Sequence, residues 1–293
     1  MKEPLILGIG EIVWDCLPAG RKLGGAPVNF AYHAMQLGAE SFPVSAVGAD
    51  ALGKETLRQC ALYGIRTDYI QTNALPTSRV LVSLDADGVP SYEIVENVAW
   101  DALEATPGVL SLAGRADAVC WGSLSQRSEA SRRAVQQILG AVPAGAMKVF
   151  DINLRQHYYS REIIEASLRQ ANVLKLNEDE LPVVLTLTGA ADIHGLVSRY
   201  SLDYLVFTCG AAFSEVHGPE GVLSHLETPK VKVADTVGAG DCFTAAFVTS
   251  LLQGASLQEA HRKAVSLSAW LCTLPGAINP LPENLNYHPA LKA

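Results

Sequence analysis

The sequence lacks the short-spaced patterns that bind metals or form disulfide frameworks. Its six cysteines are spread over 293 residues with no CxxC pair, and its seven histidines include no HExxH motif. We therefore expect no zinc site. The scattered cysteines are expected to be reduced and mostly buried, as is usual in the cytoplasm.

Long basic runs and long apolar runs are also missing. No basic run exceeds a pair such as Arg132-Arg133, and the formal net charge at pH 7 is -8. Nucleic acids and anionic membranes need a basic footprint, so neither is an expected partner. No apolar run reaches the roughly 20 residues of a membrane span. The opening MKEPLILGIG is broken by glycine too early for a signal peptide, which again favours a cytoplasmic protein.

Two common nucleotide-binding patterns are absent. The chain has no GxxxxGK[ST] loop, and its Gly8-x-Gly10 pair does not continue into GxGxxG. The second absence disfavours a nicotinamide-dependent oxidoreductase, since that pattern brings the backbone close to the pyrophosphate.

What the chain does contain is a regular alternation of short apolar runs and helical patterns. Helices are predicted over 27–38 and 51–64, and strands at 5–9, 43–48, 117–122, 148–153, 172–177 and 203–210. This alternation predicts a doubly wound α/β fold with a mostly parallel sheet and helices on both faces. Ligands of such sheets bind beyond the carboxyl ends of the strands. Asp15, Asn153, Asn177 and Gly210 fall there.

One segment, residues 77–95, interrupts the alternation. It has two β-rich runs joined by a turn containing Asp87-Gly88, which is typical of a hairpin. We expect it to form a small antiparallel sheet with residues 66–72 and part of 11–23, so that the lid spans about 66–97. An extension of the main sheet is the alternative. A lid over the site is favoured because the hairpin breaks an otherwise regular series, within one domain covering residues 1–293.

The stretch DTVGAGD (235–241) places a carboxylate where a helix begins. A helix start offers free backbone N–H groups and a positive dipole end, which together attract anions. Gly238, Ala239 and Gly240 would hold a phosphate through their backbone, and Asp241 would accept a proton from an attacking hydroxyl. The alternative is that the small residues only allow close helix–sheet packing.

Three further regions carry polar groups suited to hydroxyls, phosphates and metal ions. Asp15 follows the first strand, and Gly25 and Asn29 open the next helix, a set that suits vicinal sugar hydroxyls. In DINLR (151–155) Arg155 is placed to pair with phosphate. In KLNEDE (175–180) Asn177 and Glu180 are placed to hold waters around a metal ion. Turn and capping roles are the simpler alternatives for each.

These stretches together resemble the ribokinase-like sugar kinases of the PfkB family, over essentially the whole chain. GGAPVNFAYHAMQLG resembles the N-terminal signature of the family and DTVGAGDCFTAAFV its C-terminal signature, while NEDE fits its N-x-x-E element. The resemblance implies a doubly wound α/β domain with a β-sheet lid that often mediates dimers. It also implies ATP, magnesium and phosphoryl transfer to a sugar hydroxyl.

The resemblance also assigns roles to individual positions. Asp241 matches the catalytic base, and Gly238, Ala239 and Gly240 match the anion hole. Asp15, Gly25 and Asn29 match sugar-binding positions, Asn177 and Glu180 the magnesium-water element, and Thr208 and Gly210 the start of the nucleotide loop. Asp235 lies where many members hold a monovalent cation such as K⁺, together with the loop near 272–277. Phe213 departs from the family pattern, which has glycine there, and this puts nucleotide binding in question.

GEIVWD, GGAP and DINLR look most like the fructokinase branch, so an ATP-dependent fructokinase is the leading interpretation. A 2-keto-3-deoxygluconate kinase and a nucleoside kinase are the alternatives within the family. No basic patch is evident around Asp15, which favours a neutral sugar. A catalytically silent sugar-binding regulator is the alternative of another class, although Asp241 argues against it.

Overall fold

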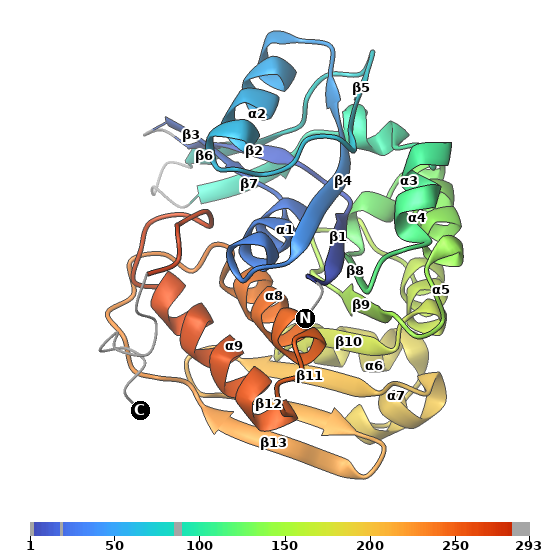
Figure 1. The fold of residues 1–293 in the computed structure, drawn as a ribbon, viewed down its shortest axis with the longest axis vertical. Coiled ribbons are helices and arrows are strands. Elements are labelled where there is room, and N and C mark those ends of the chain that lie inside the picture. The colour runs from blue at the N-terminus through green and yellow to red at the C-terminus, as the bar shows by residue number, and fades with distance from the viewer. Residues whose placement is uncertain (1–2, 18–19, 85–89, 283–293) are drawn as a thin grey trace.

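The computed structural model describes residues 3–17, 20–84 and 90–282 and contains a large and a small β-sheet (Figure 1). The strand order of the large sheet is β13 (Gly221–Glu227), β12 (Phe213–Gly218), β11 (Tyr204–Cys209), β10 (Val173–Asn177), β9 (Met147–Asp151), β8 (Ala118–Trp121), β1 (Leu5–Ile9), β4 (Glu40–Gly48) and β5 (Ile70–Asn73). Strands from β11 to β5 run parallel, and β12 and β13 add an antiparallel edge. The predicted mostly parallel α/β fold is confirmed.

Helices cover both faces of the large sheet. One face carries α1 (Ala26–Gln36), α8 (Ala239–Leu252) and α9 (Leu257–Leu271), and the other α3 (Pro107–Ala113), α4 (Glu129–Ala141), α5 (Arg161–Gln170), α6 (Glu180–Thr188) and α7 (Ile193–Tyr200). The apolar side chains of strand β1 point to both faces of the sheet, so both faces must be covered by helices. Leu5 and Leu7 pack with the second group of helices, and Ile6 between them packs with α1 and α8.

The small sheet has the order β3 (Gly20–Gly24), β2 (Val13–Leu17), β6 (Arg79–Leu84) and β7 (Pro90–Ile94). Helix α2 (Ala51–Leu62) lies beside it, where the Trp14 indole donates to Thr56 Oγ1 at 2.7 Å. Two expectations are wrong here. Residues 66–72 do not join this sheet, because β5 pairs with β4 in the large sheet. The sheet is also mixed rather than antiparallel, since β2 and β6 run parallel. The Asp87-Gly88 turn lies outside the described residues.

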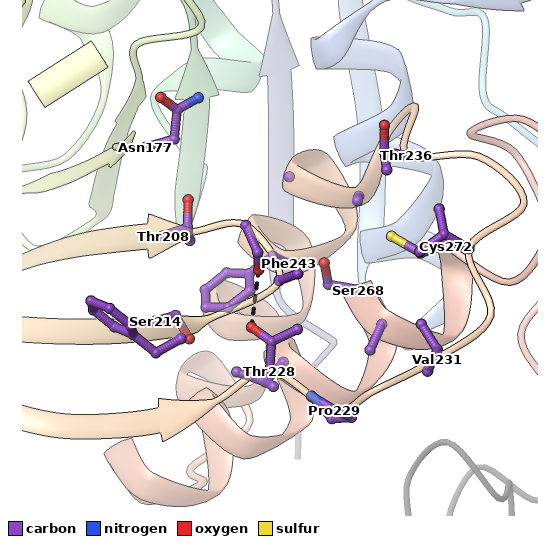
Figure 2. Close-up of a pocket in the computed structure, with 18 of the residues that line it drawn as sticks. Asn177, Thr208, Ser214, Thr228, Pro229, Val231, Thr236, Phe243, Ser268 and Cys272 are labelled. Atoms are coloured by element: carbon purple, nitrogen blue, oxygen red, sulfur yellow. Dashed lines mark hydrogen bonds between the residues drawn. The ribbon is translucent and has the colours of Figure 1, made fainter. Parts of the chain in front are cut away.

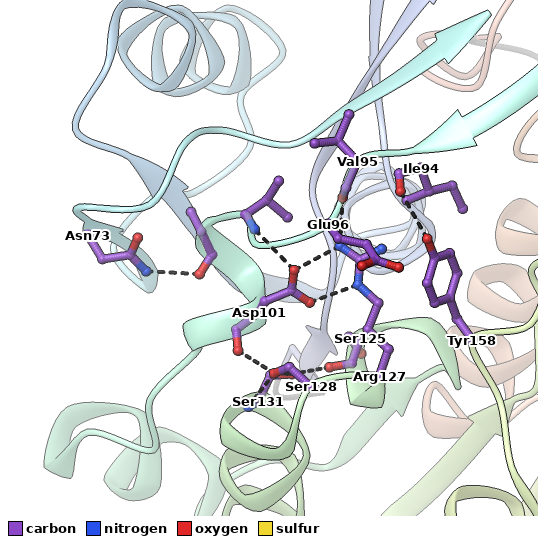
Figure 3. Close-up of polar contacts among 12 residues, drawn as sticks. Asn73, Ile94, Val95, Glu96, Asp101, Ser125, Arg127, Ser128, Ser131 and Tyr158 are labelled. Carbon is purple, nitrogen blue, oxygen red and sulfur yellow. Dashed lines mark hydrogen bonds and ion pairs between the residues drawn. The ribbon is translucent and has the colours of Figure 1, made fainter.

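A buried arginine joins the base of the small sheet to the large domain (Figure 3). The Arg127 guanidinium donates to both carboxylate oxygens of Asp101 at 2.8 Å and to the carbonyl of Val95, just after β7. Its Cζ atom lies 4.1 Å from the ring centroid of Trp100 and 4.7 Å from that of Tyr158. Asp101 belongs to the 3₁₀ helix η1 (Ala99–Ala102), and Arg127 follows a second one, η2 (Leu124–Gln126). Arg127 thus fixes the point where β7 leaves the core.

All six cysteines are free and four of them are buried, as expected for reduced thiols. In the described part of the chain no single helix is both long and apolar enough to cross a membrane, although the bent pair α6–α7 passes by length and composition.

Candidate active site

Two adjoining cavities open at the carboxyl ends of the parallel strands. The first, of about 570 Å³, lies beside β11, β12 and the start of α8, and we call it the β11 cavity (Figure 2). The second, of about 660 Å³, lies between the small sheet and the carboxyl ends of β9 and β10, and we call it the small-sheet cavity. Lys175, Asn177, Thr236 and Gly240 line both cavities, so the two spaces meet at the start of α8.

Glycines lie at the cap and in the first turn of α8. Gly238 caps the helix with φ 76°, and an added Cβ would lie 2.4 Å from the Ala277 side chain. An added Cβ on Gly240 would lie 2.8 Å from Lys175 Nζ. The Ala239 N–H donates to the Thr236 carbonyl, whereas the N–H groups of Gly240 and Asp241 donate to none of the described residues. These last two groups are therefore available to an anion at the helix start.

Asp241 lies in the first turn of α8 and reaches the small-sheet cavity. Desolvation and the nearby Asp151 carboxylate raise the pKa of Asp241 to about 6, while the Asn29 amide, Lys175 and Arg155 oppose this. Asn29 Nδ2 donates to Asp241 Oδ2 at 2.8 Å, which fixes the orientation of the carboxylate. Asn29 Oδ1 is buried and finds no partner among the described residues, so it is free to accept a hydrogen bond.

Asp15, on the small sheet, faces the same cavity together with two cations. Burial raises the pKa of Asp15, and the charges of Arg155 and Lys22 oppose that rise. The expectation that no basic group surrounds Asp15 is therefore wrong. Lys22 was missed because it enters through the pairing of β3 with β2, which places it opposite Asp15. Because Lys22 and Arg155 lie near Asp15, the charges around Asp15 do not favour a neutral sugar over an acidic one.

Glu11 is a further carboxyl in the small-sheet cavity, and the sequence analysis did not identify it. It is 3% exposed, and its Oε2 atom has no partner within the described residues. Desolvation raises the pKa of Glu11 to about 7. The neighbouring Gly25 has φ 115°, and an added Cβ would lie 2.5 Å from the Glu11 carbonyl oxygen. Gly25 therefore lets the start of α1 lie directly against this segment.

The loop after β9 brings Arg155 to the small-sheet cavity through an unusual backbone. Asn153 and Gln156 have φ values of 46° and 49°, in the left-handed region that side chains other than glycine seldom adopt. Both line the cavity, and Arg155 lies exposed between them. Asp151, the last residue of β9, also lines it and accepts from Lys175 Nζ at 3.1 Å. Neither Asp151 nor Lys175 was predicted as a site residue.

Asn177 and Glu180 form a compact hydrogen-bonded unit at the end of β10. Glu180 is buried, and its carboxylate accepts from the N–H groups of Leu154 at 3.0 Å and Asn177 at 2.9 Å. The Asn177 side-chain oxygen accepts from the N–H groups of Asp179 and Glu180. The described residues contain no cluster of three His, Cys, Asp or Glu side chains able to hold a metal ion. A metal ion here would need ligands from a bound molecule.

Thr208 and Gly210 line the β11 cavity, and the Thr228 hydroxyl donates to the Gly210 carbonyl at 3.0 Å (Figure 2). Phe213, the residue that departs from the family pattern, lines the same cavity. It stacks on His225 with ring centroids 5.0 Å apart. Phe213 therefore adds an aromatic wall where a glycine would leave space.

Asp235 lies at the edge of the small-sheet cavity and already has several partners. Its carboxylate accepts from the N–H groups of Val237 at 3.1 Å and Gly276 at 2.9 Å, and Lys22 Nζ lies 3.6 Å away. Burial alone would raise the pKa of Asp235, but these donors and the Lys22 charge hold it below its usual value. The hydrogen bond from Gly276 places Asp235 beside the 272–277 loop, which the sequence analysis paired with Asp235 as a candidate cation site.

Residues 16–284 match the profile described as pfkB family carbohydrate kinase. The chain belongs to this family. A fructokinase of Escherichia coli is 30% identical over 302 residues, covering 94% of this chain and 95% of the relative.

Solved structures agree with the fold of this pfkB-family chain. The fructokinase of Xylella fastidiosa with bound ATP is similar with a TM-score of 0.83 and 23% identity, covering 95% of each chain. A fructokinase double mutant of Vibrio cholerae with fructose, ADP and potassium ion has a TM-score of 0.79 and 23% identity, covering 96% of this chain and 95% of the other. The family match confirms the resemblance, and these structures agree with the fold.

Each residue that the sequence analysis named for the site lies in one of the two cavities. Thr208, Gly210 and Ala239 line the β11 cavity. Asn177 and Gly240 line both, and the small-sheet cavity also receives Asp15, Gly25, Asn29, Arg155, Glu180, Asp235, Gly238 and Asp241.

Proposed function

We propose that the protein transfers the γ-phosphoryl group of ATP to a sugar hydroxyl, with fructose as the leading substrate. The observation that carries this proposal is the meeting of the two cavities at Gly240, beside the Asp241 carboxylate. A donor nucleotide in the β11 cavity and an acceptor in the small-sheet cavity would then meet at one helix start.

The reaction needs one proton acceptor and one anion site. The sugar oxygen attacks the γ-phosphorus, its proton moves to Asp241, and the bond to the bridging oxygen breaks, so that ADP leaves with the electron pair. The free N–H groups of Gly240 and Asp241 and the dipole of α8 would stabilise the negative charge of the transferring group. Asn29 orients Asp241 by its hydrogen bond to Oδ2.

Substrate binding is assigned to the small-sheet cavity. Asp15 accepts hydrogen bonds from sugar hydroxyls, the main chain at Gly25 approaches the sugar closely, and the free Oδ1 of Asn29 accepts another. Arg155 is exposed on the rim and pairs with the phosphoryl group or with a charged substituent. The small sheet contributes Val80 and Ile94 to the cavity wall, which supports its role as a lid that excludes water.

The β11 cavity suits a nucleotide because apolar side chains from α8 and α9 face the polar ends of β10 and β11 (Figure 2). Asn177 and Glu180 would hold Mg²⁺ through water, because backbone N–H groups already occupy the Glu180 oxygens. When bound, Mg²⁺ neutralises phosphate charge. The Vibrio cholerae structure contains potassium, and Asp235 with the Gly276 segment is the corresponding candidate for a K⁺ site here.

Fructose is the leading candidate substrate because a relative named fructokinase, from E. coli, aligns over 94% of this chain. Lys22 and Arg155 beside Asp15 keep an acidic sugar such as 2-keto-3-deoxygluconate as the second candidate, because either cation can pair with its carboxylate.

The test is an assay with the purified chain, ATP and MgCl₂, in which ADP release and sugar phosphate are both measured. Fructose, 2-keto-3-deoxygluconate, ribose and adenosine serve as acceptors. We expect the largest kcat/KM with fructose. A larger kcat/KM with 2-keto-3-deoxygluconate or adenosine would make that compound the substrate in place of fructose, and the protein would still be a kinase. Tight sugar binding with no phosphorylated product would identify a sugar-binding regulator instead.

A further inference from the structure

We propose that Lys175 is a further catalytic residue, whose side-chain ammonium contacts the transferring phosphoryl group where the two cavities meet. The proposal rests on the phosphoryl transfer proposed above. It adds a cation from the floor of the site, on strand β10, to the N–H groups of α8.

The position of Lys175 is the first argument. Its side chain is only 11% exposed, yet it lines both cavities, a property it shares with Gly240. An added Cβ on Gly240 would lie 2.8 Å from Nζ, so the ammonium lies directly against the turn whose N–H groups are free. A group bound at those N–H groups would be within reach of Nζ as well.

The hydrogen bonds of Lys175 leave it capacity for a ligand. An ammonium has three donors. Among the described residues its partner is Asp151, at 3.1 Å, and Asp151 also accepts from the Thr244 hydroxyl at 3.0 Å. This arrangement anchors the carboxylate from behind and holds the ammonium at the junction of the two cavities.

The charges around the junction supply the second argument. Asp151 and Asp241 would both repel an incoming phosphoryl group, and the Lys175 charge offsets that repulsion. Asp151 Oδ1 lies 3.1 Å from Lys175 Nζ, and this ion pair favours the charged ammonium. The alternative is a purely structural ion pair between β9 and β10.

Two variants separate these roles. Lys175→Met and Asp151→Asn each break the ion pair, but only the first removes the ammonium. We expect Lys175→Met to lower kcat by about 10²–10³-fold, as for removal of one transition-state donor, while the KM for sugar changes less than threefold. We expect Asp151→Asn to lower kcat by about tenfold or less. Equal losses of kcat in the two variants would overturn the proposal and leave the structural ion pair.

The pH profile gives an independent reading. Asp241 is faced by Lys175 on β10, Asp151 on β9, Arg155 in the following loop, Asn29 on α1 and Glu11 beyond β1. Lys175→Met removes a cation that lowers the pKa of Asp241, so the acid limb of the kcat profile should shift to higher pH. Removing an anion should shift it to lower pH in Asp151→Asn. Shifts in the same direction would contradict the assignment.

Binding measurements guard against loss of fold. ADP and sugar should bind Lys175→Met almost normally in calorimetry, whereas ADP with aluminium fluoride, in the presence of sugar, should bind at least tenfold more weakly. If Lys175→Met does not fold, Lys175→Gln keeps a polar partner for Asp151 and should show the same pattern. Unchanged aluminium fluoride binding overturns the proposal. If the wild-type chain phosphorylates no acceptor, both proposals fall, whereas an active wild type with equal variants refutes this one alone.

Discussion

The proposed role of Asp241 as proton acceptor places two conflicting demands on one side chain. A proton acceptor must be ionised when the hydroxyl attacks, but desolvation and Asp151 raise the pKa of Asp241 to about 6. Its pKa is therefore closer to neutral pH than the pKa of an exposed carboxyl group, which favours general-base catalysis.

Replacing Asp241 with Asn should remove the base while keeping its size and its contact with Asn29. We expect kcat to fall by about 10²–10⁴-fold, with much smaller changes in ATP and sugar affinity. In the wild type, kcat should fall as the pH decreases through about 6, because protonated Asp241 cannot accept the proton. Steady-state kinetics between pH 5 and pH 8 would check both. A variant with near-normal kcat would leave Asp241 a packing role only.

The same substitution should stabilise the fold at alkaline pH. The folded state binds the Asp241 proton more tightly than the unfolded chain, because the pKa rises from 3.8 to about 6. This contribution is fully present below pH 3.8 and is lost as the pH rises through 6. At pH 8 the free energy of unfolding of Asp241→Asn should therefore be about 1–3 kcal/mol higher than that of the wild type. Urea titrations at pH 8 and pH 4 would test this, and the difference should shrink at pH 4.

Asp15 should affect the sugar and not the nucleotide, because it faces the small-sheet cavity alone. Asp15→Ala should cost roughly 1.5–3 kcal/mol of sugar binding for each charge-assisted hydrogen bond lost, with ATP affinity nearly unchanged. Calorimetric titration with each ligand measures this directly. Equal losses for both ligands would mean that Asp15 does not bind sugar.

At the scale of elements, the attachment of the small sheet depends on Arg127. The Arg127–Asp101 pair is 6% and 9% exposed, so loss of the cation leaves a buried, unpaired carboxylate. Arg127→Met should lower the free energy of unfolding by about 3–5 kcal/mol. Arg133→Met, on the neighbouring helix α4, removes an exposed pair with Glu129 and should cost less than about 1 kcal/mol. Similar losses in both would mean that the Arg127 cluster is not a structural junction.

At the scale of the whole molecule, the outer face of the small sheet is the candidate dimer surface. Val80 points into the cavity, so Leu81, the next residue of β6, points outward and is 40% exposed. If two small sheets pair, Leu81→Asp should convert the dimer to a monomer in sedimentation velocity, whereas Leu62→Asp on α2 should not. A wild-type chain that sediments as a monomer would contradict the dimer.

Much of the molecule was predictable because its signals are local. The alternation of short apolar runs with helical patterns and the start of α8 can be read from neighbouring residues, and so the parallel sheet and the place of Asp241 at a helix start were predicted. Lys22 and Lys175 were missed although each lies within three residues of a predicted site residue, because only strand pairing shows that Lys22 lies opposite Asp15 and Lys175 opposite Asp151. Residues 66–72 were misplaced for the same reason, since a short β-rich run does not specify which sheet it will join.

The hydrogen bond between Asn29 and Asp241 joins residues that are 212 positions apart. The ribosome therefore releases Asp15, Gly25 and Asn29 early in synthesis, while the turn at 238–240 and Asp241 emerge only with the final quarter of the chain. Gly240 and Asp241 of α8 line the small-sheet cavity, so that cavity stays incomplete until α8 has been synthesised. An unfinished chain lacks the start of α8, and so a nascent chain cannot consume ATP at this site before its synthesis is nearly complete.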